Sequence, residues 1–180
     1  MPRFVALFRG INVGRARRVA MADLRALLES LGFGGVRTLL NSGNAVFDGP
    51  AESHLKLARR IQAAVASKLG VDALVIVKSA KDIAAVVTGN KFGVIATDPS
   101  RLLVALTHDA KSLEALGSIA HAEWGDEKVH LGKHAAYVWC ANGILESKAG
   151  VALLSGLGQS GTTRNWSTVA KIHALLQNAD

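Results

Sequence analysis

The stretch of sequence that decides the fold is VRTLLNSGNAVF, residues 36–47, because it predicts a β-hairpin in the first half of the chain. Val36 to Leu40 and Ala45 to Phe47 are rich in apolar residues and read as two short strands. Between them, Asn41-Ser42-Gly43-Asn44 has the composition of a tight turn. The stretch therefore predicts two adjacent strands joined by that turn.

Helical spacing of apolar residues appears on both sides of this hairpin. It runs from Met21 to Leu31 before it and from Leu55 to Leu69 after it, and each segment is followed by a glycine. Short apolar runs at residues 3–8 and 73–77 predict the two outer strands. The order strand, helix, strand, strand, helix, strand is that of a ferredoxin-like unit.

A second unit is expected after a short helix around Lys81 to Val87. Arg101 to Leu106 repeats the character of the first strand, residues 128–131 and 135–140 predict a hairpin, and Trp166 begins a last helix. The predicted fold is therefore α+β, with two ferredoxin-like βαββαβ units, the second incomplete or modified, and antiparallel sheets with helices on one face. The predicted domains are 1–90 and 101–180, joined by a linker over 91–100.

The composition of the 180 residues predicts a globular protein. Hydrophobic residues make up 49% of the chain and charged residues 19%, which is ample material for a packed core. The apolar runs are far shorter than the roughly 20 residues that cross a bilayer, so we expect no membrane partner. The single cysteine, Cys140, excludes a disulfide framework. These features predict a cytoplasmic protein.

Positive charge is concentrated at the start of the chain. The formal net charge is +7, and residues 1–18 contain five arginines and no acidic residue. The excess is a single cluster, whereas proteins that bind a long duplex usually spread basic residues along a face or groove. The distribution favours a small anion, and nucleic acid is a possible but less favoured partner.

The arginines lie in the connection between the first strand and the first helix. If the first strand runs up, its helix runs down, the second strand runs up and the third runs down. This connection and the 42–44 turn then lie at the same end of the sheet. A basic loop next to a small polar turn is typical of an anion site. The candidate ligand-binding residues here are Arg9, Asn12, Arg15, Arg17, Arg18, Ser42 and Asn44.

A second candidate segment is Thr162-Thr163-Arg164-Asn165-Trp166, just before the last helix. Asn165 or Thr163 is a suitable N-cap, and the start of a helix favours a negative charge. Arg164 would add a bidentate donor for an anion. Thr163, Arg164 and Asn165 are therefore included among the candidate ligand-binding residues, on the expectation that Arg164 faces the first unit.

The chain resembles the bacterial domain-of-unknown-function family 1697. The resemblance rests on residues 9–14, the helix that opens at Met21, residues 36–38 with 42–44, Ser147-Lys148 and residues 163–166. It implies a duplicated ferredoxin-like fold and no particular activity. The sequence departs from the family pattern at Arg15, where a second glycine is common, and at Leu39-Leu40-Asn41.

Together these features predict a module that binds a small, phosphate-containing anion. One alternative is an enzyme acting on a phosphorylated or acyl substrate, with Asp23, His108 or His173 as the base. The other alternative is an RNA- or DNA-binding protein. No metal site or cofactor is predicted, because His130 and His134 lack a further ligand at suitable spacing. The sequence makes no prediction of the oligomeric state.

Overall fold

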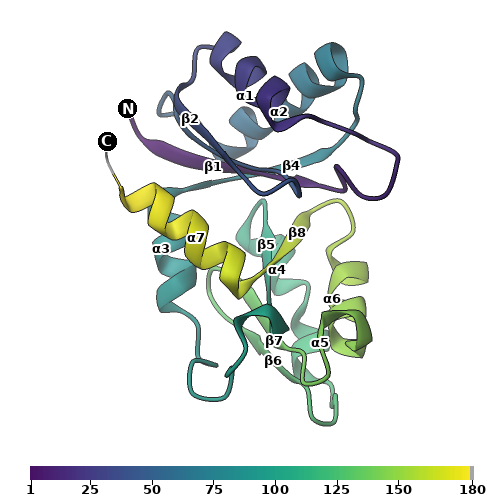
Figure 1. Ribbon diagram of the computed structural model, residues 1–180. Helices are drawn as coiled ribbons and strands as arrows, with labels where there is room; N and C mark the ends of the chain where they lie inside the picture. Colours follow the sequence, from purple (N-terminus) through teal and green to yellow (C-terminus); the bar gives the residue numbers. More distant parts are fainter. Residues whose placement is uncertain (179–180) are drawn as a thin grey trace. The chain divides into compact units, whose positions relative to one another are not determined.

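The first half of the chain forms a four-stranded antiparallel sheet with two helices, as seen in the computed structural model, which describes residues 1–178 (Figure 1). The sheet has the strand order β2-β3-β1-β4. In chain order the elements are β1 (Arg3–Arg9), α1 (Met21–Ser30), β2 (Gly34–Leu39), β3 (Asn44–Asp48), α2 (His54–Leu69) and β4 (Leu74–Ser79). The order of elements and of strands confirms the predicted ferredoxin-like unit.

Helices α1 and α2 lie on one face of this sheet (Figure 1). The core between them consists of apolar side chains from both layers, among them Phe8, Leu24, Leu28, Phe47 and Ile61. Helix α2 ends at Leu69, as its sequence predicts, and begins at His54, one residue before the predicted start. The Ser53 side chain accepts a hydrogen bond from the Lys56 amide, and Gly70 adopts the left-handed conformation (φ 67°) that commonly ends a helix.

The second half of the chain forms another four-stranded antiparallel sheet, with strand order β6-β7-β5-β8. This order is equivalent, strand for strand, to that of the first sheet. The elements are α3 (Ala80–Thr88), a 3₁₀ turn (Pro99–Arg101), β5 (Leu102–Thr107), α4 (Ala110–Glu114), α5 (Gly117–His121), β6 (Lys128–Leu131), β7 (Ala136–Trp139), a 3₁₀ turn (Ile144–Glu146), α6 (Lys148–Leu157), β8 (Gly161–Asn165) and α7 (Trp166–Gln177).

The second unit is modified rather than incomplete. Its first helix is divided into the five-residue helices α4 and α5. The glycine-rich residues 156–161, which in sequence look like a flexible loop, form the end of α6, a turn and the start of β8. Residues 162–165 likewise belong to a strand, which pairs antiparallel with β5, and not to a loop before the last helix.

Helix α6 forms in spite of its two glycines because its first turn is well capped. The Ser147 hydroxyl accepts a hydrogen bond from the Gly150 amide at 2.8 Å. The carboxylate of Glu127 accepts hydrogen bonds from the Lys148 and Ala149 amides and from the Ser147 hydroxyl. A negative charge at the start of a helix also interacts favourably with the helix dipole.

By their contacts, residues 1–81 form one unit with residues 174–178, and residues 82–173 form a second unit. This division differs from the boundaries expected from sequence at two places. Helix α3 goes largely with the second unit, where the Tyr137 hydroxyl donates a hydrogen bond to the Val86 carbonyl at 2.5 Å. The end of the chain goes with the first unit, where Arg3 donates to the Asn178 carbonyl at 2.7 Å.

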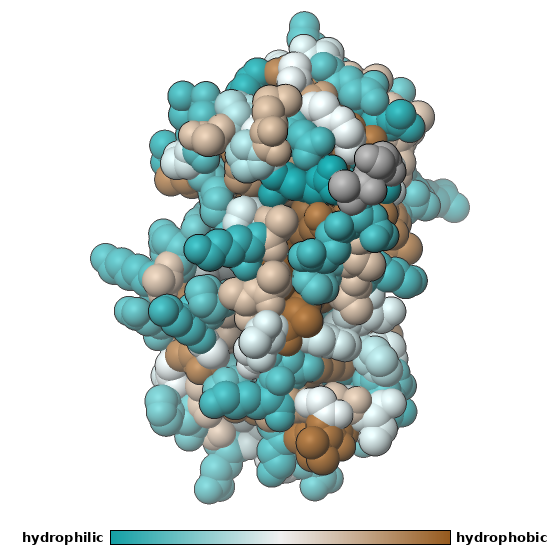
Figure 2. Space-filling view, turned by 90° about the vertical axis from the view of Figure 1, so that its left-hand side faces the viewer, coloured by the Kyte–Doolittle hydropathy of each residue, from teal (hydrophilic) through white to brown (hydrophobic). Residues whose placement is uncertain are grey.

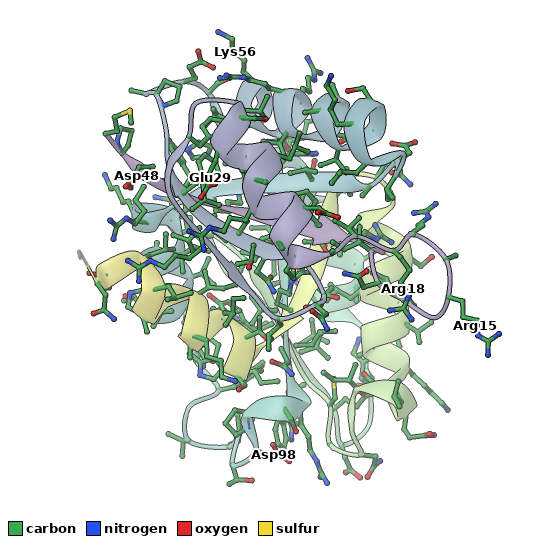
Figure 3. The ribbon with its side chains drawn as sticks, turned by 45° about the horizontal axis from the view of Figure 1, so that its top comes forward. Arg15, Arg18, Glu29, Asp48, Lys56 and Asp98 are labelled. Carbon is green, nitrogen blue, oxygen red and sulfur yellow. The ribbon has the colours of Figure 1, made fainter. Side chains whose placement is uncertain are left out.

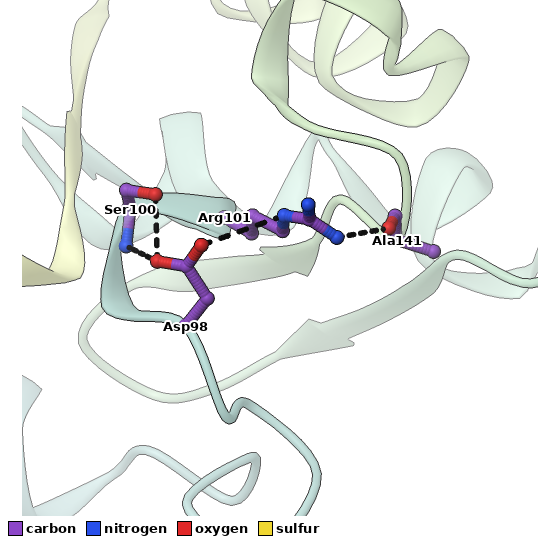
Figure 4. A network of polar contacts seen from close by, with 4 residues as sticks. All are labelled: Asp98, Ser100, Arg101 and Ala141. Carbon is purple, nitrogen blue, oxygen red and sulfur yellow. Dashed lines mark hydrogen bonds and ion pairs between the residues drawn. The ribbon is translucent and has the colours of Figure 1, made fainter.

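The segment predicted as a linker leads into β5 through a small polar network (Figure 4). The Asp98 carboxylate accepts hydrogen bonds from the Ser100 amide and hydroxyl at 2.9 and 2.7 Å, and these bonds lower the pKa of Asp98. Arg101 lies 3.5 Å from the same carboxylate and donates to the Ala141 carbonyl. The network holds the start of β5 beside the segment that follows β7.

On the face shown in Figure 2, apolar residues occur in small groups separated by hydrophilic ones. Within residues 1–178, the helices lack the combination of length and apolar character that crossing a membrane requires.

Candidate functional site

The connection between β1 and α1 is a loop of unusual backbone conformation. Asn12 and Arg17 both have φ of 55°, and Gly10 and Gly14 have φ of 74° and 62°. Asparagine and glycine tolerate this left-handed region better than other residues. Arg17 does not share that tolerance, and its conformation coincides with a hydrogen bond from the Asn12 amide to the Arg17 carbonyl, 3.0 Å long.

The side chain of Asn12 holds the loop closed. Its Oδ1 accepts a hydrogen bond from the Val19 amide at 2.8 Å, and its Nδ2 donates to the Val19 carbonyl at 2.8 Å. The same Nδ2 also donates to the Asn41 carbonyl at 2.7 Å. One side chain therefore joins the two ends of the loop and connects the loop to the β2–β3 turn.

The loop and the β2–β3 turn lie at the same end of the sheet, which confirms the sequence prediction. The Phe8 amide donates to the Gly43 carbonyl at 2.9 Å. Gly43 packs so closely that a Cβ atom there would lie 2.5 Å from the Ile11 side chain. Ile11 is only 1% exposed, so the loop begins with a residue buried in the core.

A pocket of about 300 Å³ opens where this loop meets α1. It is lined by Asn12, Arg18, Val19, Ala20, Met21 and Asn41. Ala20 is the N-cap of α1 and provides no side-chain hydrogen bond, so the first amides of the helix lack a side-chain cap. The start of an uncapped helix carries partial positive charge and unsatisfied N–H donors.

Three arginines of the loop are exposed, and their positions differ. Arg15 lies at the outer tip of the loop and points away from the protein, whereas Arg18 lies nearer the start of α1 (Figure 3). The guanidinium of Arg17 folds back toward Gly10. Within residues 1–178, none of these three guanidinium groups makes an ion pair or a hydrogen bond. Their charge is therefore uncompensated by protein groups.

The other candidates of the first unit are more deeply integrated in the fold. Arg9 is half-buried at the end of β1 and makes interactions within the protein. Asn44 is 1% exposed, and its Nδ2 donates to the Leu39 carbonyl at 2.8 Å and to the Ser42 hydroxyl at 3.4 Å. Asn44 and Ser42 thus stabilise the β2–β3 turn that borders the pocket.

Thr163, Arg164 and Asn165 belong to β8 of the second unit. Burial lowers the pKa of Arg164 to about 10, and its Nη1 donates to the Thr162 hydroxyl and the Thr163 carbonyl at 3.0 and 2.8 Å. The Asn165 side chain accepts a hydrogen bond from the Thr168 amide, so Asn165, one of the two candidates from sequence, is the N-cap. Arg9 and Arg164 lie in different units, and their meeting stays a prediction.

Sequence reasoning missed four residues that line the pocket: Val19, Ala20, Met21 and Asn41. The available signal was a helix pattern beginning at Met21 without Ser, Thr, Asp or Asn before it.

Of the candidate bases, Asp23 lies in the first turn of α1, and His108 and His173 belong to the second unit. Among residues 1–178, no three His, Cys, Asp or Glu side chains are grouped so as to hold a metal ion.

Comparisons with known proteins agree with this fold. A solved structure described as that of the conserved bacterial protein SP0830 from Streptococcus pneumoniae superimposes with a TM-score of 0.79 and 26% sequence identity, over 98% of this chain and 99% of that one. No protein with a curated description matches the chain. The family model described as "Protein of unknown function (DUF1697)" matches residues 1–137. The chain therefore belongs to the DUF1697 family.

Proposed function

We propose that the first unit binds a small anion that contains a phosphate group, in the pocket between the β1–α1 loop and the start of α1. The observation that carries this proposal is the uncapped first turn of α1, which borders a pocket of about 300 Å³ also lined by Arg18. Helix N-termini bind phosphate through free amides and the favourable end of the helix dipole. The guanidinium of Arg18 supplies a charge-assisted donor beside them.

The remaining groups have distinct roles in this proposal. Asn12 holds the loop against the β2–β3 turn, so its amide shapes the pocket and is already used by the protein. Arg15 and Arg17 lie on the same loop and raise the local positive potential, which attracts an anion from solution. The volume lies at the lower end of the range for small-molecule sites, which favours a small ligand.

Arg18→Ala is expected to weaken the binding of inorganic phosphate and of ribose 5-phosphate about tenfold, because it removes a charge-assisted hydrogen bond. Isothermal titration calorimetry at low ionic strength measures both affinities. Arg25→Ala is the matched control, since Arg25 is an exposed arginine of α1 already paired with Glu29 at 3.0 Å. Equal affinities of wild type and Arg18→Ala, or equal losses in the two variants, would contradict the proposal.

A further inference from the structure

The second unit contains a pocket of about 520 Å³ between α4 and the turn that joins β6 to β7. This position is equivalent to that of the pocket in the first unit, where the start of the first helix faces the first hairpin turn. The two units thus place a pocket at the same end of equivalent sheets. The chemistry differs, because the connection before α4 is only His108-Asp109 and carries no arginine.

The start of α4 is already capped in the second unit. The Asp109 carboxylate accepts a hydrogen bond from the Ser112 amide at 2.8 Å. The acidic cap disfavours an anion at the helix start, so the second pocket does not repeat the chemistry of the first. Its ligand must be recognised by other groups that line it.

Those groups are an apolar floor and a rim of mixed charge. Leu113, which is 3% exposed, and the half-buried Leu131 supply the apolar part. Glu114, Lys133 and His134 are exposed and also line the pocket. In the part of the chain that the structure describes, none of these three side chains makes an ion pair or a hydrogen bond with the protein.

This combination suits a ligand with an apolar body and both charges at one end. The apolar part of the ligand covers the apolar side chains of the pocket and excludes water from them. This burial is the main source of affinity in small-molecule pockets. A ligand ammonium pairs with Glu114, and a ligand carboxylate pairs with Lys133 and His134. A ligand that carries only one charge leaves some of the charged side chains of the rim unpaired. A ligand that carries only a carboxylate is also repelled by the carboxylate of Glu114.

We propose that this pocket binds a free amino acid with an apolar side chain. The side chain lies against Leu113 and Leu131, the ammonium faces Glu114 and the carboxylate faces Lys133. This site is separate from the phosphate site and does not depend on it.

The experiment compares three ligands that share one apolar body: L-phenylalanine, 3-phenylpropionate, which lacks the ammonium, and phenethylamine, which lacks the carboxylate. Titrations of the full chain followed by ¹H–¹⁵N NMR give the affinities. L-phenylalanine is expected to bind at least threefold more tightly than either analogue, which is the scale of one exposed charge pair. Equal affinities of the three ligands, or no binding of L-phenylalanine at millimolar concentration, would overturn the proposal.

Variants test the assignment of each charge. Lys133→Gln is expected to weaken the binding of L-phenylalanine about threefold and to leave the binding of phenethylamine unchanged. Glu114→Gln is expected to weaken the binding of L-phenylalanine but not that of 3-phenylpropionate. Lys111→Gln is the control, because Lys111 is an exposed lysine of α4 that does not line the pocket. Arg18→Ala, which impairs only the phosphate site, should bind L-phenylalanine like wild type. The assignment fails if Lys133→Gln and Lys111→Gln have the same effect.

Discussion

Gly43→Ala is expected to destabilise the first unit by about 3–5 kcal/mol, enough to unfold many single domains. Gly43 has φ of 92°, and a Cβ there would lie 2.5 Å from Ile11 Cδ1 and 2.9 Å from Phe8 Cβ. Ile11 and Phe8 are both 1% exposed, so neither has room to move. The free energy of unfolding, measured by urea denaturation followed by circular dichroism, checks this expectation.

Gly32→Ala is the matched control for this variant. Gly32 has a similar φ of 84°, but no atom lies within 4 Å of a Cβ built there. This control carries the backbone strain of a positive φ, about 1–2 kcal/mol, without the steric overlap. If both variants lose the same free energy of unfolding, the β2–β3 turn does not pack against Ile11 as described.

Asn12→Ala is expected to lower the free energy of unfolding by about 2–4 kcal/mol and to weaken phosphate binding at the same time. The variant removes three hydrogen bonds of 2.7–2.8 Å that close the loop and join it to the β2–β3 turn. It also places alanine at φ 55°, which asparagine tolerates better. Urea denaturation and calorimetric titration with inorganic phosphate measure the two effects.

Asn41→Ala separates the role of the Asn12 side chain from that of the turn. The Asn41 carbonyl, which accepts from Asn12, is retained in this variant, and within residues 1–178 the Asn41 side chain makes no hydrogen bond. We therefore expect Asn41→Ala to change the free energy of unfolding by less than about 0.5 kcal/mol. A loss in Asn41→Ala as large as in Asn12→Ala would show that the Asn12 amide does not hold the loop.

The first unit could be predicted from sequence because its local signals agree with one another. Helix α2 has a regular apolar spacing, a serine before its first turn and a glycine after its last. The hairpin turn contains Gly43, whose positive φ the turn requires. Local propensity, hydrophobic pattern and turn chemistry all indicated the same elements there.

The end of the second unit could not be predicted in this way, because its elements depend on tertiary contacts. Strand β8 has the sequence GTTRN, which contains no apolar run, and it becomes a strand by pairing with β5. Helix α6 contains Gly150 and Gly156, which weaken the helical signal. It is supported by the Glu127 carboxylate, a group 21 residues before Lys148 in the sequence. No local pattern contains that information.

The position of the arginine loop beside the β2–β3 turn was predicted from sequence, but the residues that line the adjacent pocket were not. Charge clustering and strand order were sufficient to place the arginine loop beside the β2–β3 turn. The hydrogen bonds of Asn12 and the opening beside Ala20 depend on backbone positions that no spacing rule describes. An amide that holds a loop and an amide that binds a ligand look the same in a sequence.

Titration of the ¹⁵N-labelled protein with inorganic phosphate, followed by ¹H–¹⁵N NMR, tests the central claim most directly. The backbone amides of Met21, Ala22 and Asp23, which begin α1, have no acceptor earlier in the helix. We predict that these amides show the largest shift changes, that the changes saturate, and that Arg18→Ala reduces the affinity obtained from them. Changes confined to other parts of the chain, or none at the start of α1, would contradict the claim that this helix start binds the anion.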